Sequence, residues 1–538
     1  MKDKTSFFIR GFTQSATLTL FSRISGFIRD IFIAAFLGAG VFSDIFLIAF
    51  KIPNLFRRIT AEGALTSAFL PIYSKLIEQK GKIIADNFLK TFIFFVAIFL
   101  ILLMIFIQII MPFIVYFLAP GFSDNNLVFE QITTLTRITI IFMPLISIVA
   151  LLGVATNVYG KFWILSFTPI ILNSCLIISC FFINDDLSIR SLPLAFATVL
   201  GGILQLIFIL TMIKKFGVLK LKILDIKSYT GKKFNEIKLY LKTTWKKFLP
   251  AAFGGGVLQI NLLVDTILAS LLGFGSVSYL YFADRIAQLP LGIIGIALSS
   301  TLLASLSKSS AIKDTKQFTK ELIISLRIGL FFSIPSSFVF INFSELFIRV
   351  LFERGEFGSI ETNQTAQALI AYAFGIPAFI MLKSCQPAFL ADGNTKTPMY
   401  IGLILLLLNI FLSFLFMHYL DHIGIALATS LVSWIGSFIY LVLLIKKRKI
   451  LKFKFNLKLD ETNLLFIFNY ALKLVLTSFL MILFMKITFY TLNIYKLNEI
   501  FILLSLVLIG LITYLLTNYF LKYIPQELLI GKVIKLRK

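Results

Sequence analysis

The sequence predicts an all-α protein that crosses a membrane about fourteen times, and three observations support this class. Of the 538 residues, 58% are hydrophobic and only 14% are charged, whereas soluble domains are about half apolar and about a quarter charged. The mean hydropathy is +0.94. Apolar windows of roughly 20 residues, the length that spans a bilayer as a helix, follow one another along the whole chain.

This composition excludes a soluble enzyme, a disordered chain and a secreted disulfide scaffold. Cys175, Cys180 and Cys385 lie in apolar stretches without a metal-binding or disulfide spacing. His418 and His422 stand at the end of one window, where a solvated loop is a simpler explanation than a metal site. The net charge of +25 would suggest nucleic-acid binding in a soluble protein. In a membrane protein it indicates basic cytoplasmic loops, and we expect no nucleic-acid partner.

The positions of the basic residues predict the orientation. The candidate spans lie near residues 11–37, 43–72, 89–118, 131–156, 162–183, 190–213, 247–272, 276–305, 320–343, 361–383, 399–418, 423–445, 463–488 and 498–521. With a cytoplasmic N-terminus, the even-numbered gaps carry an excess of Lys and Arg, as at Lys75, Lys161 and Lys308. The opposite gaps are richer in acids, as at Asp124 and Glu353. Both termini are therefore predicted to be cytoplasmic.

An internal repeat predicts the domain organisation. Asp30 and Gly38 recur as Asp265 and Gly273, and further matches keep a nearly constant offset of about 235 residues. We predict an N-terminal lobe with six spans at 1–215, a basic amphipathic linker on the membrane surface at 216–246, and a second six-span lobe at 247–446. Residues 447–538 add two spans and a cytoplasmic tail. Parallel repeats are typical of secondary transporters with a site between the halves, although an old duplication in a non-transporting scaffold gives the same pattern.

Charged residues inside the first, second and eighth spans predict the binding site. A charge at the centre of a span costs roughly 2.5–3.5 kcal/mol, so these residues should face a wet cavity or pair with one another. The candidate substrate-binding residues are Arg23, Arg29, Asp30, Asp44, Arg57, Arg58, Glu62, Asp284, Arg285 and Gln288. Arg binds phosphate in a bidentate way and stays charged when buried, which favours a phosphorylated anionic substrate. The alternative is that Arg29–Asp30 and Asp284–Arg285 are structural pairs while Arg57 and Arg58 reach the cytoplasm.

These residues belong to motifs that resemble the MurJ/MviN lipid II flippases. The motifs are Ser22 to Asp30, Gly38 to Gly40, Asp44, Ile52 to Arg58, Ala61 to Ala64, Ala283 to Gly292 and Asp392 to Pro398. The resemblance covers about residues 10 to 450. It implies the fold of the multidrug/oligosaccharidyl-lipid/polysaccharide exporter superfamily and a location in the inner membrane of a bacterium. It also implies the transfer of undecaprenyl-pyrophosphate-linked peptidoglycan precursor, lipid II, to the outer leaflet for cell-wall biogenesis.

The resemblance also implies roles for individual residues. Arg23, Arg29 and Arg57 would line the cavity and hold the pyrophosphate, and Arg285 would approach from the second lobe. Asp30, Asp44 and Glu62 would orient the arginines or line gates. The last two spans would offer a groove for the prenyl tail. Gln288 stands where some relatives carry Glu, so an acidic role there is in doubt.

A cation site in the second lobe is a further implication of the resemblance. Asp265, Asn409 and Thr429 would supply oxygen ligands to Na⁺, although Ser413 stands where some relatives have a second Asp. The alternative is that Asn409 and Thr429 form hydrogen bonds between helices, and that Asp265 is the repeat counterpart of Asp30.

The mechanism expected from the sequence is alternating access without chemistry on the substrate, so we expect a transporter and not an enzyme. No Walker motif is present and no cofactor is expected; coupling to Na⁺, to H⁺ or to the membrane potential remains open. The expected partners are lipid II, membrane lipids and proteins of cell-wall synthesis, and we expect a monomer. A flippase for another polyprenyl-linked oligosaccharide and a cation-coupled drug exporter of the same fold are the alternatives.

Overall fold

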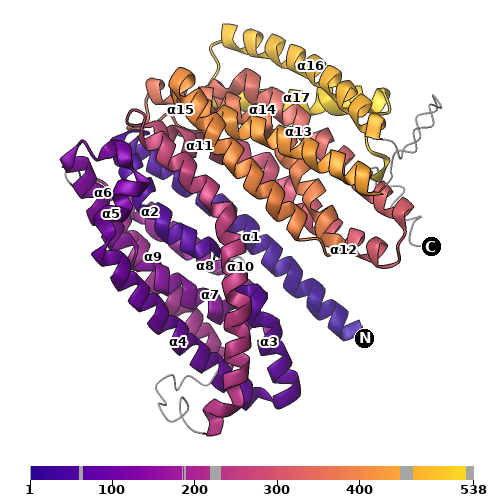
Figure 1. Cartoon of the computed structure of the whole chain (residues 1–538). Helices are drawn as coiled ribbons and strands as arrows, with labels where there is room; N and C mark the ends of the chain where they lie inside the picture. Colours follow the sequence, from indigo (N-terminus) through magenta and orange to yellow (C-terminus); the bar gives the residue numbers. More distant parts are fainter. Residues whose placement is uncertain are drawn as a thin grey trace. The chain divides into compact units, whose positions relative to one another are not determined.

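The computed structural model describes residues 2–59, 65–184, 186, 189–218, 232–448 and 464–528. Nearly all of this part of the chain is helical and none of it forms a β-strand, which confirms the predicted all-α class. Two compact units are present (Figure 1). Unit 1 comprises Met1–Ser278 and Arg354–Phe357, and unit 2 comprises Tyr279–Glu353 and Gly358–Lys538.

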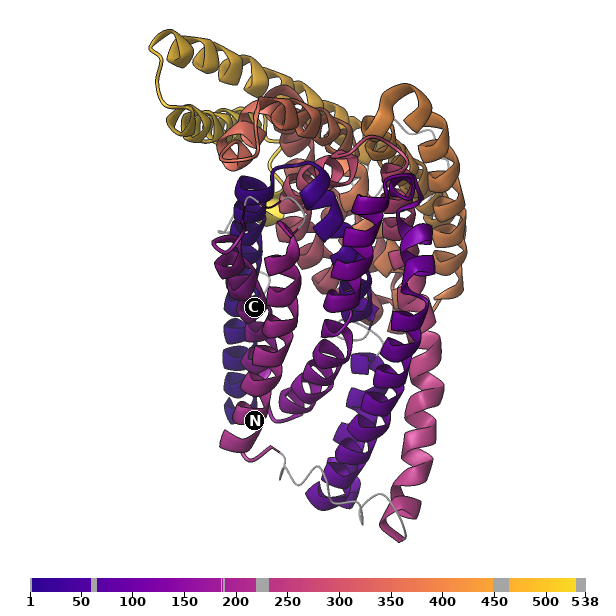
Figure 2. The same ribbon diagram turned by 90° about the vertical axis from the view of Figure 1, so that its left-hand side faces the viewer.

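Unit 1 is a bundle of helices that run side by side (Figure 2). Its helices are α1 (Lys2–Leu37), α2 (Val41–Ile59), α3 (Leu65–Lys80), α4 (Lys82–Ile109), α5 (Met111–Leu118), the short η2 (Pro120–Phe122), α6 (Asn126–Thr139), α7 (Phe142–Val158), α8 (Phe162–Cys180), α9 (Leu192–Lys215) and α10 (Lys232–Ser270). The closest pairs are α1 with α8, α8 with α9, and α7 with α9. Stacked rings of Phe69, Phe88 and Phe92 fill the core between α3 and α4.

Unit 2 contains the remaining helices. They are α11 (Ser276–Pro290), whose first residues belong to unit 1, the π-helical turn η4 (Leu291–Gly295), α12 (Ile296–Ala311), α13 (Thr315–Phe352), α14 (Ser359–Ala391), α15 (Lys396–Arg448), α16 (Leu464–Ile494), α17 (Glu499–Phe520) and η5 (Gln526–Leu528). Helix α14 packs between α13 and α15, and α16 packs on both α13 and α17. The buried hydroxyl of Tyr514 on α17 donates a hydrogen bond of 2.7 Å to the Phe331 carbonyl on α13.

The loops of unit 1 alternate between its two ends, as the charge pattern predicts. At one end, the Lys82 ammonium donates to the Gly217 carbonyl at 2.6 Å and lies 5.3 Å from the centre of the Tyr159 ring. We call this the lysine end. At the opposite end, the Ser191 hydroxyl donates to the Phe42 carbonyl at 2.8 Å. Even-numbered gaps therefore meet at the lysine end and odd-numbered gaps at the opposite end.

The apolar helices coincide with the predicted spans. In the described part of the chain, nine helices are long and apolar enough to cross a membrane, and the longest, Lys396–Lys446, covers two predicted spans. It bends sharply at Asp421, where φ is 47°. The predicted spans near 11–37, 43–72, 247–272 and 276–305 fall on α1, α2–α3, α10 and α11–α12, which are more charged or interrupted. These are the first two spans of each repeat, and they carry most of the candidate site residues.

Part of the predicted linker differs from its expected position. Residues 232–246 form the first turns of α10 and continue without a break into the seventh span. Ile237 and Leu241 are buried, and the Trp245 ring lies 5.9 Å from Phe92 and 5.8 Å from Phe99 on α4. These turns therefore pack within unit 1, with the Trp245 ring against α4. Residues 219–231 lie outside the described residues, and the domain boundaries themselves stay a prediction.

Candidate functional site

A buried network between α1 and α8 fixes the direction of Arg29. Its Nη2 and Nε donate to Asp30 Oδ1 at 2.7 Å and 3.0 Å, and its Nη1 donates to Asn173 Oδ1 at 3.1 Å. The Asn173 amide nitrogen in turn donates to the Ser25 hydroxyl at 2.9 Å and to the Ser22 carbonyl at 3.3 Å. Arg29 is thus oriented by one carboxylate and one neutral amide.

Asn173 was not among the residues predicted from the sequence. It is 5% exposed and lies in the middle of α8, within an apolar span. An amide inside a span is costly unless it forms hydrogen bonds, and such residues often join helices. The position of Asn173 inside an apolar span could have marked it as a hydrogen-bonding residue. The sequence alone does not show which helix carries its partner.

Arg23 lies on a different side of α1 from Arg29. The two residues are six positions apart, which corresponds to about 9 Å along a helix and about 120° around it. Because Ser22, Ser25 and Arg29 contact α8, Arg23 points away from that helix, and its side chain is exposed. Helix α1 therefore presents two arginines in two directions.

Arg57 and Arg58 lie in the last turn of α2 and are half-buried. Arg57 Nε donates to Asn54 Oδ1 at 3.0 Å, and Arg58 Nη1 donates to Gln259 Oε1 of α10 at 3.4 Å. Both guanidinium groups are thus oriented by neutral amide oxygens. Glu62, which the sequence predicts one turn later, lies outside the described residues.

Asp44 is fully buried at the start of α2 and caps a different helix. Its carboxylate accepts hydrogen bonds from the Gly275 N–H at 2.6 Å, the Ser278 N–H at 2.8 Å and the Ser278 hydroxyl at 2.7 Å. A carboxylate at the first turn of α11 satisfies free N–H groups and interacts favourably with the helix dipole. Asp44 lies about 21 Å along α2 from Arg58, so its position fits a structural tie better than a phosphate cradle.

In unit 2, Asp284, Arg285 and Gln288 occupy α11. The Gln288 amide donates a short hydrogen bond to Asp284 Oδ2. Arg285 Nη2 donates to the Tyr281 hydroxyl at 3.0 Å, and the guanidinium lies 4.6 Å from the centre of that ring. The aromatic ring and its hydroxyl hold the Arg285 charge in one orientation.

Two of the three predicted Na⁺ ligands are neighbours in unit 2. Thr429 Oγ1 donates to Asn409 Oδ1 at 3.3 Å, across the bend in α15. The Ser413 hydroxyl, one turn after Asn409, is fully buried and has no hydrogen-bond partner among the described residues. Asp265 lies on α10 of unit 1. The donor set of unit 2 is thus neutral oxygen, which suits a hard monovalent cation and also fits hydrogen bonding between helices.

The two histidines bind separate backbone groups. His418 Nδ1 lies 2.7 Å from the Phe414 carbonyl and is exposed, whereas the buried His422 Nε2 lies 3.0 Å from the Gln364 carbonyl of α14. Within the described ranges, no group of three His, Cys, Asp or Glu side chains is placed to hold a metal ion.

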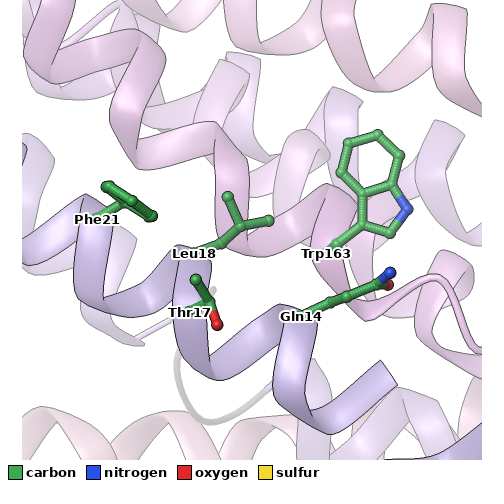
Figure 3. Close-up of a pocket in the computed structure, with 5 residues that line it drawn as sticks. All are labelled: Gln14, Thr17, Leu18, Phe21 and Trp163. Atoms are coloured by element: carbon green, nitrogen blue, oxygen red, sulfur yellow. The ribbon is translucent and has the colours of Figure 1, made fainter. Parts of the chain in front are cut away.

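A pocket of about 400 Å³ opens beside α1 in unit 1 (Figure 3). Its lining residues are Gln14, Thr17, Leu18, Phe21 and Trp163. The four from α1 have the spacing of one helix face, the same side that further along carries Ser22 and Ser25. The walls are mostly apolar, so the pocket suits a hydrocarbon segment better than a charged group. Among the described residues, none of the predicted site residues lines it.

Comparison with known proteins identifies the family. The family model described as lipid II flippase MurJ matches residues 33–530. A protein of Rickettsia prowazekii (strain Madrid E), named "Probable lipid II flippase MurJ", is 37% identical over 421 residues, which cover 78% of this chain and 80% of that protein. "Lipid II flippase MurJ" of Burkholderia cenocepacia (strain J2315) is 30% identical over 432 residues, covering 80% of this chain and 82% of that protein.

Solved structures agree with the sequence comparison. The structure described as "Lipid II flippase MurJ, inward closed conformation" has a TM-score of 0.74 and 29% identity, covering 94% of this chain and 98% of that chain. An inward-facing multidrug resistance transporter of the MATE family and MOP superfamily has a TM-score of 0.65 with 12% identity, covering 82% and 99%, and shows the fold alone. With its apolar helices, the chain is a multi-pass bacterial membrane protein, and it belongs to the MurJ lipid II flippase family.

Proposed function

We propose that this protein moves lipid II from the cytoplasmic to the periplasmic leaflet of the bacterial inner membrane by alternating access. The observation that carries the proposal is the orientation of Arg29 by Asn173 and Asp30 at the seam between α1 and α8. A guanidinium held in place by hydrogen bonds loses little further conformational entropy when it binds a pyrophosphate. The exposed Arg23, on another side of α1, offers a second positive charge to the same class of ligand.

The proposed cycle uses positive charge to bind the head group while the prenyl tail stays in the bilayer. Arg23, Arg29 and Arg57 of unit 1 take the pyrophosphate in this proposal, and a role for Arg285 is what the sequence resemblance implies. No bond of lipid II is made or broken, so the activity is transport and not enzymatic catalysis. Both termini lie in the cytoplasm in this proposal, because the lysine end of unit 1 carries the basic even-numbered loops.

Two driving forces fit the charged groups. The membrane potential contributes about 2.3 kcal/mol per charge per 100 mV and returns positive cavity residues toward the cytoplasm. Na⁺ binding near Asn409 and Thr429 of unit 2 is the second, and the Ser413 hydroxyl, which has no hydrogen-bond partner among the described residues, supports a further oxygen donor there. A role for Asp265 as the charged ligand is what the sequence resemblance implies. Coupling to H⁺ through Asp265 is the alternative. We propose a monomer that works beside the proteins of cell-wall synthesis.

Two alternatives have less support. A flippase for another polyprenyl-linked oligosaccharide would use the same arginines, and the family match favours lipid II. A cation-coupled drug exporter shares the fold, but the arginines on α1 and α2 disfavour a cationic substrate.

Complementation tests the proposal. The chain is expressed in a bacterium depleted of its own lipid II flippase, and growth and outer-leaflet lipid II are measured. Arg23→Ala, Arg29→Ala and Arg57→Ala should each abolish rescue at unchanged protein level, and Arg29→Lys should rescue poorly because it cannot form the same hydrogen bonds. The matched control is Arg137→Ala, at an exposed position in the last turn of α6. Full rescue by the three Ala variants would refute the pyrophosphate site.

The cation is tested separately on purified protein. Na⁺ should raise the thermal midpoint of the unmodified chain, and Asp265→Asn and Asn409→Ala should each remove that increase. A Na⁺ effect that persists in both variants excludes this site, without affecting the conclusion about lipid II.

A further inference from the structure

A short segment between two helices of unit 2 belongs to the packing of unit 1. Residues Arg354–Phe357 connect α13 to α14, both helices of unit 2, yet the segment packs as part of unit 1. The Glu356 N–H donates to the Ala35 carbonyl at 2.9 Å, near the end of α1. The segment thus continues the hydrogen bonding of α1 at the opposite end of unit 1.

Two glycines allow this close approach. Gly355 has φ of +60°, and a Cβ built on it would lie 2.1 Å from the Ala35 carbonyl oxygen. Gly38 has φ of +68°, and its Cβ would lie 2.6 Å from the Glu356 carbonyl oxygen. Any larger residue at either position would clash with backbone and would adopt an unfavourable conformation. The fit is therefore specific and not a loose surface contact.

An ion pair completes the contact. Arg190 Nη2, just before α9, lies 2.9 Å from Glu356 Oε1. The guanidinium also lies 5.3 Å from the centre of the Phe42 ring, at the start of α2. The Arg190 side chain is 13% exposed and that of Glu356 is 53% exposed. Arg190 is thus held in place by unit 1, while the carboxylate arrives on the inserted segment and stays accessible to water.

The segment is covalently linked on both sides to helices of unit 2, so movement of those helices acts on the contact. The chain between the end of α13 at Phe352 and the start of α14 at Ser359 is short, so movement of these helices pulls directly on Glu356. A partly solvated ion pair and one backbone hydrogen bond are weak enough to break and re-form during such a movement. A fully buried pair would not release as readily, because separating its charges leaves them without partners.

We propose that Arg190 and the segment Arg354–Phe357 form a releasable clasp. The clasp closes the opposite end of unit 1 in one state of the transport cycle and opens in the other. Arg190 and Glu356 are its positioning residues. The proposal rests on the alternating access proposed above. The clasp does not touch lipid II; it sets the balance between states. Gly38 and Gly355 provide the shape, and the ion pair provides the reversible part of the stability.

Charge reversal tests the clasp without lipid II. The three native cysteines are replaced by Ser, and a reporter Cys is introduced at Gly40, where a Cβ meets nothing within 4 Å. A membrane-impermeant maleimide is then applied to purified protein. Arg190→Glu and Glu356→Arg should each raise the labelling rate several-fold, and the double swap should return it close to that of the parent. The control is reversal of Arg349 and Glu345, an ion pair within α13.

A second variant tests the need for release. Arg190→Cys with Glu356→Cys, joined by a short thiol-reactive cross-linker, should keep the protein folded, judged by size-exclusion profile, and able to bind lipid II. Outer-leaflet lipid II should fall to the level of cells without the flippase. Normal flipping by the cross-linked protein, or equal labelling of the singles, the swap and the parent, overturns the clasp. Loss of lipid II binding in the unmodified chain would instead overturn the proposed function.

Discussion

The capping of α11 by Asp44 leads to a quantitative prediction for Asp44→Ala. The change leaves two backbone N–H groups and one hydroxyl without the acceptor that they now share. Each buried donor left unsatisfied costs about 1–3 kcal/mol. The Ser278 hydroxyl can turn fully to the Gly275 carbonyl, which it already approaches at 3.1 Å. The two N–H groups that remain unsatisfied therefore lower the free energy of unfolding by roughly 2–6 kcal/mol.

The expected shift in the thermal midpoint follows from the size of the protein. Unfolding entropy is about 2.1 cal/mol/K per residue, which gives roughly 1.1 kcal/mol/K for the 538 residues. A loss of roughly 2–6 kcal/mol then lowers the midpoint by roughly 2–5 °C. The measurement is thermal unfolding of the purified protein in detergent, followed by intrinsic fluorescence. Asp124→Asn is the control, because Asp124 is an exposed acid in an odd-numbered loop of the same unit.

Refutation is simple. If Asp44→Ala unfolds within about 1 °C of the parent, the hydrogen bonds to Gly275 and Ser278 do not contribute the free energy assigned to buried donors. A decrease in the control of the same size would show that the effect is not specific to the cap.

Further variants test the other buried contacts. Asn173→Ala should leave the protein level unchanged but reduce rescue of a flippase-depleted strain, because Arg29 and Ser25 lose a common partner. Asn173→Asp should reduce rescue further, because it adds a second carboxylate beside Arg29. Equal rescue by the two variants would count against the network. Gly375→Ala should destabilise the protein by about 1–3 kcal/mol because its Cβ would lie 2.5 Å from Ser430 Oγ, whereas Gly402→Ala, with nothing within 4 Å, should be neutral in the same thermal assay. Tyr514→Phe should cost about 1–2 kcal/mol by leaving the Phe331 carbonyl without its donor, and an unchanged midpoint would show that water replaces the hydroxyl.

Several features of the site were predictable because they depend on residue type and local spacing. A charged residue inside an apolar span is visible in the sequence. Arg23, Arg29 and Arg57 could therefore be selected as candidate binding residues without a structure. The Gly-rich turns between spans and the basic even-numbered loops likewise follow from local sequence. The sequence analysis left two interpretations of the charged residues inside the spans, a wet cavity or structural ion pairs. The structure contains the ion pair between Arg29 and Asp30.

Other features depend on which helices become neighbours. Asn173 meets Arg29 across 144 positions of sequence, and Asp44 meets Ser278 across 234, so no local pattern reports either contact. The exposed Arg23 and the enclosed Arg29 differ because one side of α1 packs on α8. The insertion of Arg354–Phe357 beside Ala35 depends on two distant glycines being brought together.

The sequence by itself determined the helical class, the apolar spans, the alternating loops and the family, because hydrophobic burial and the cost of charge in a bilayer act on each segment separately. Tertiary structure decided which polar groups satisfy one another, because a hydrogen bond needs its donor and acceptor within about 3 Å and packing alone sets that distance. Asp44 illustrates the difference. Its charge marked it as a candidate for the binding site, and its surroundings make it the cap of a helix.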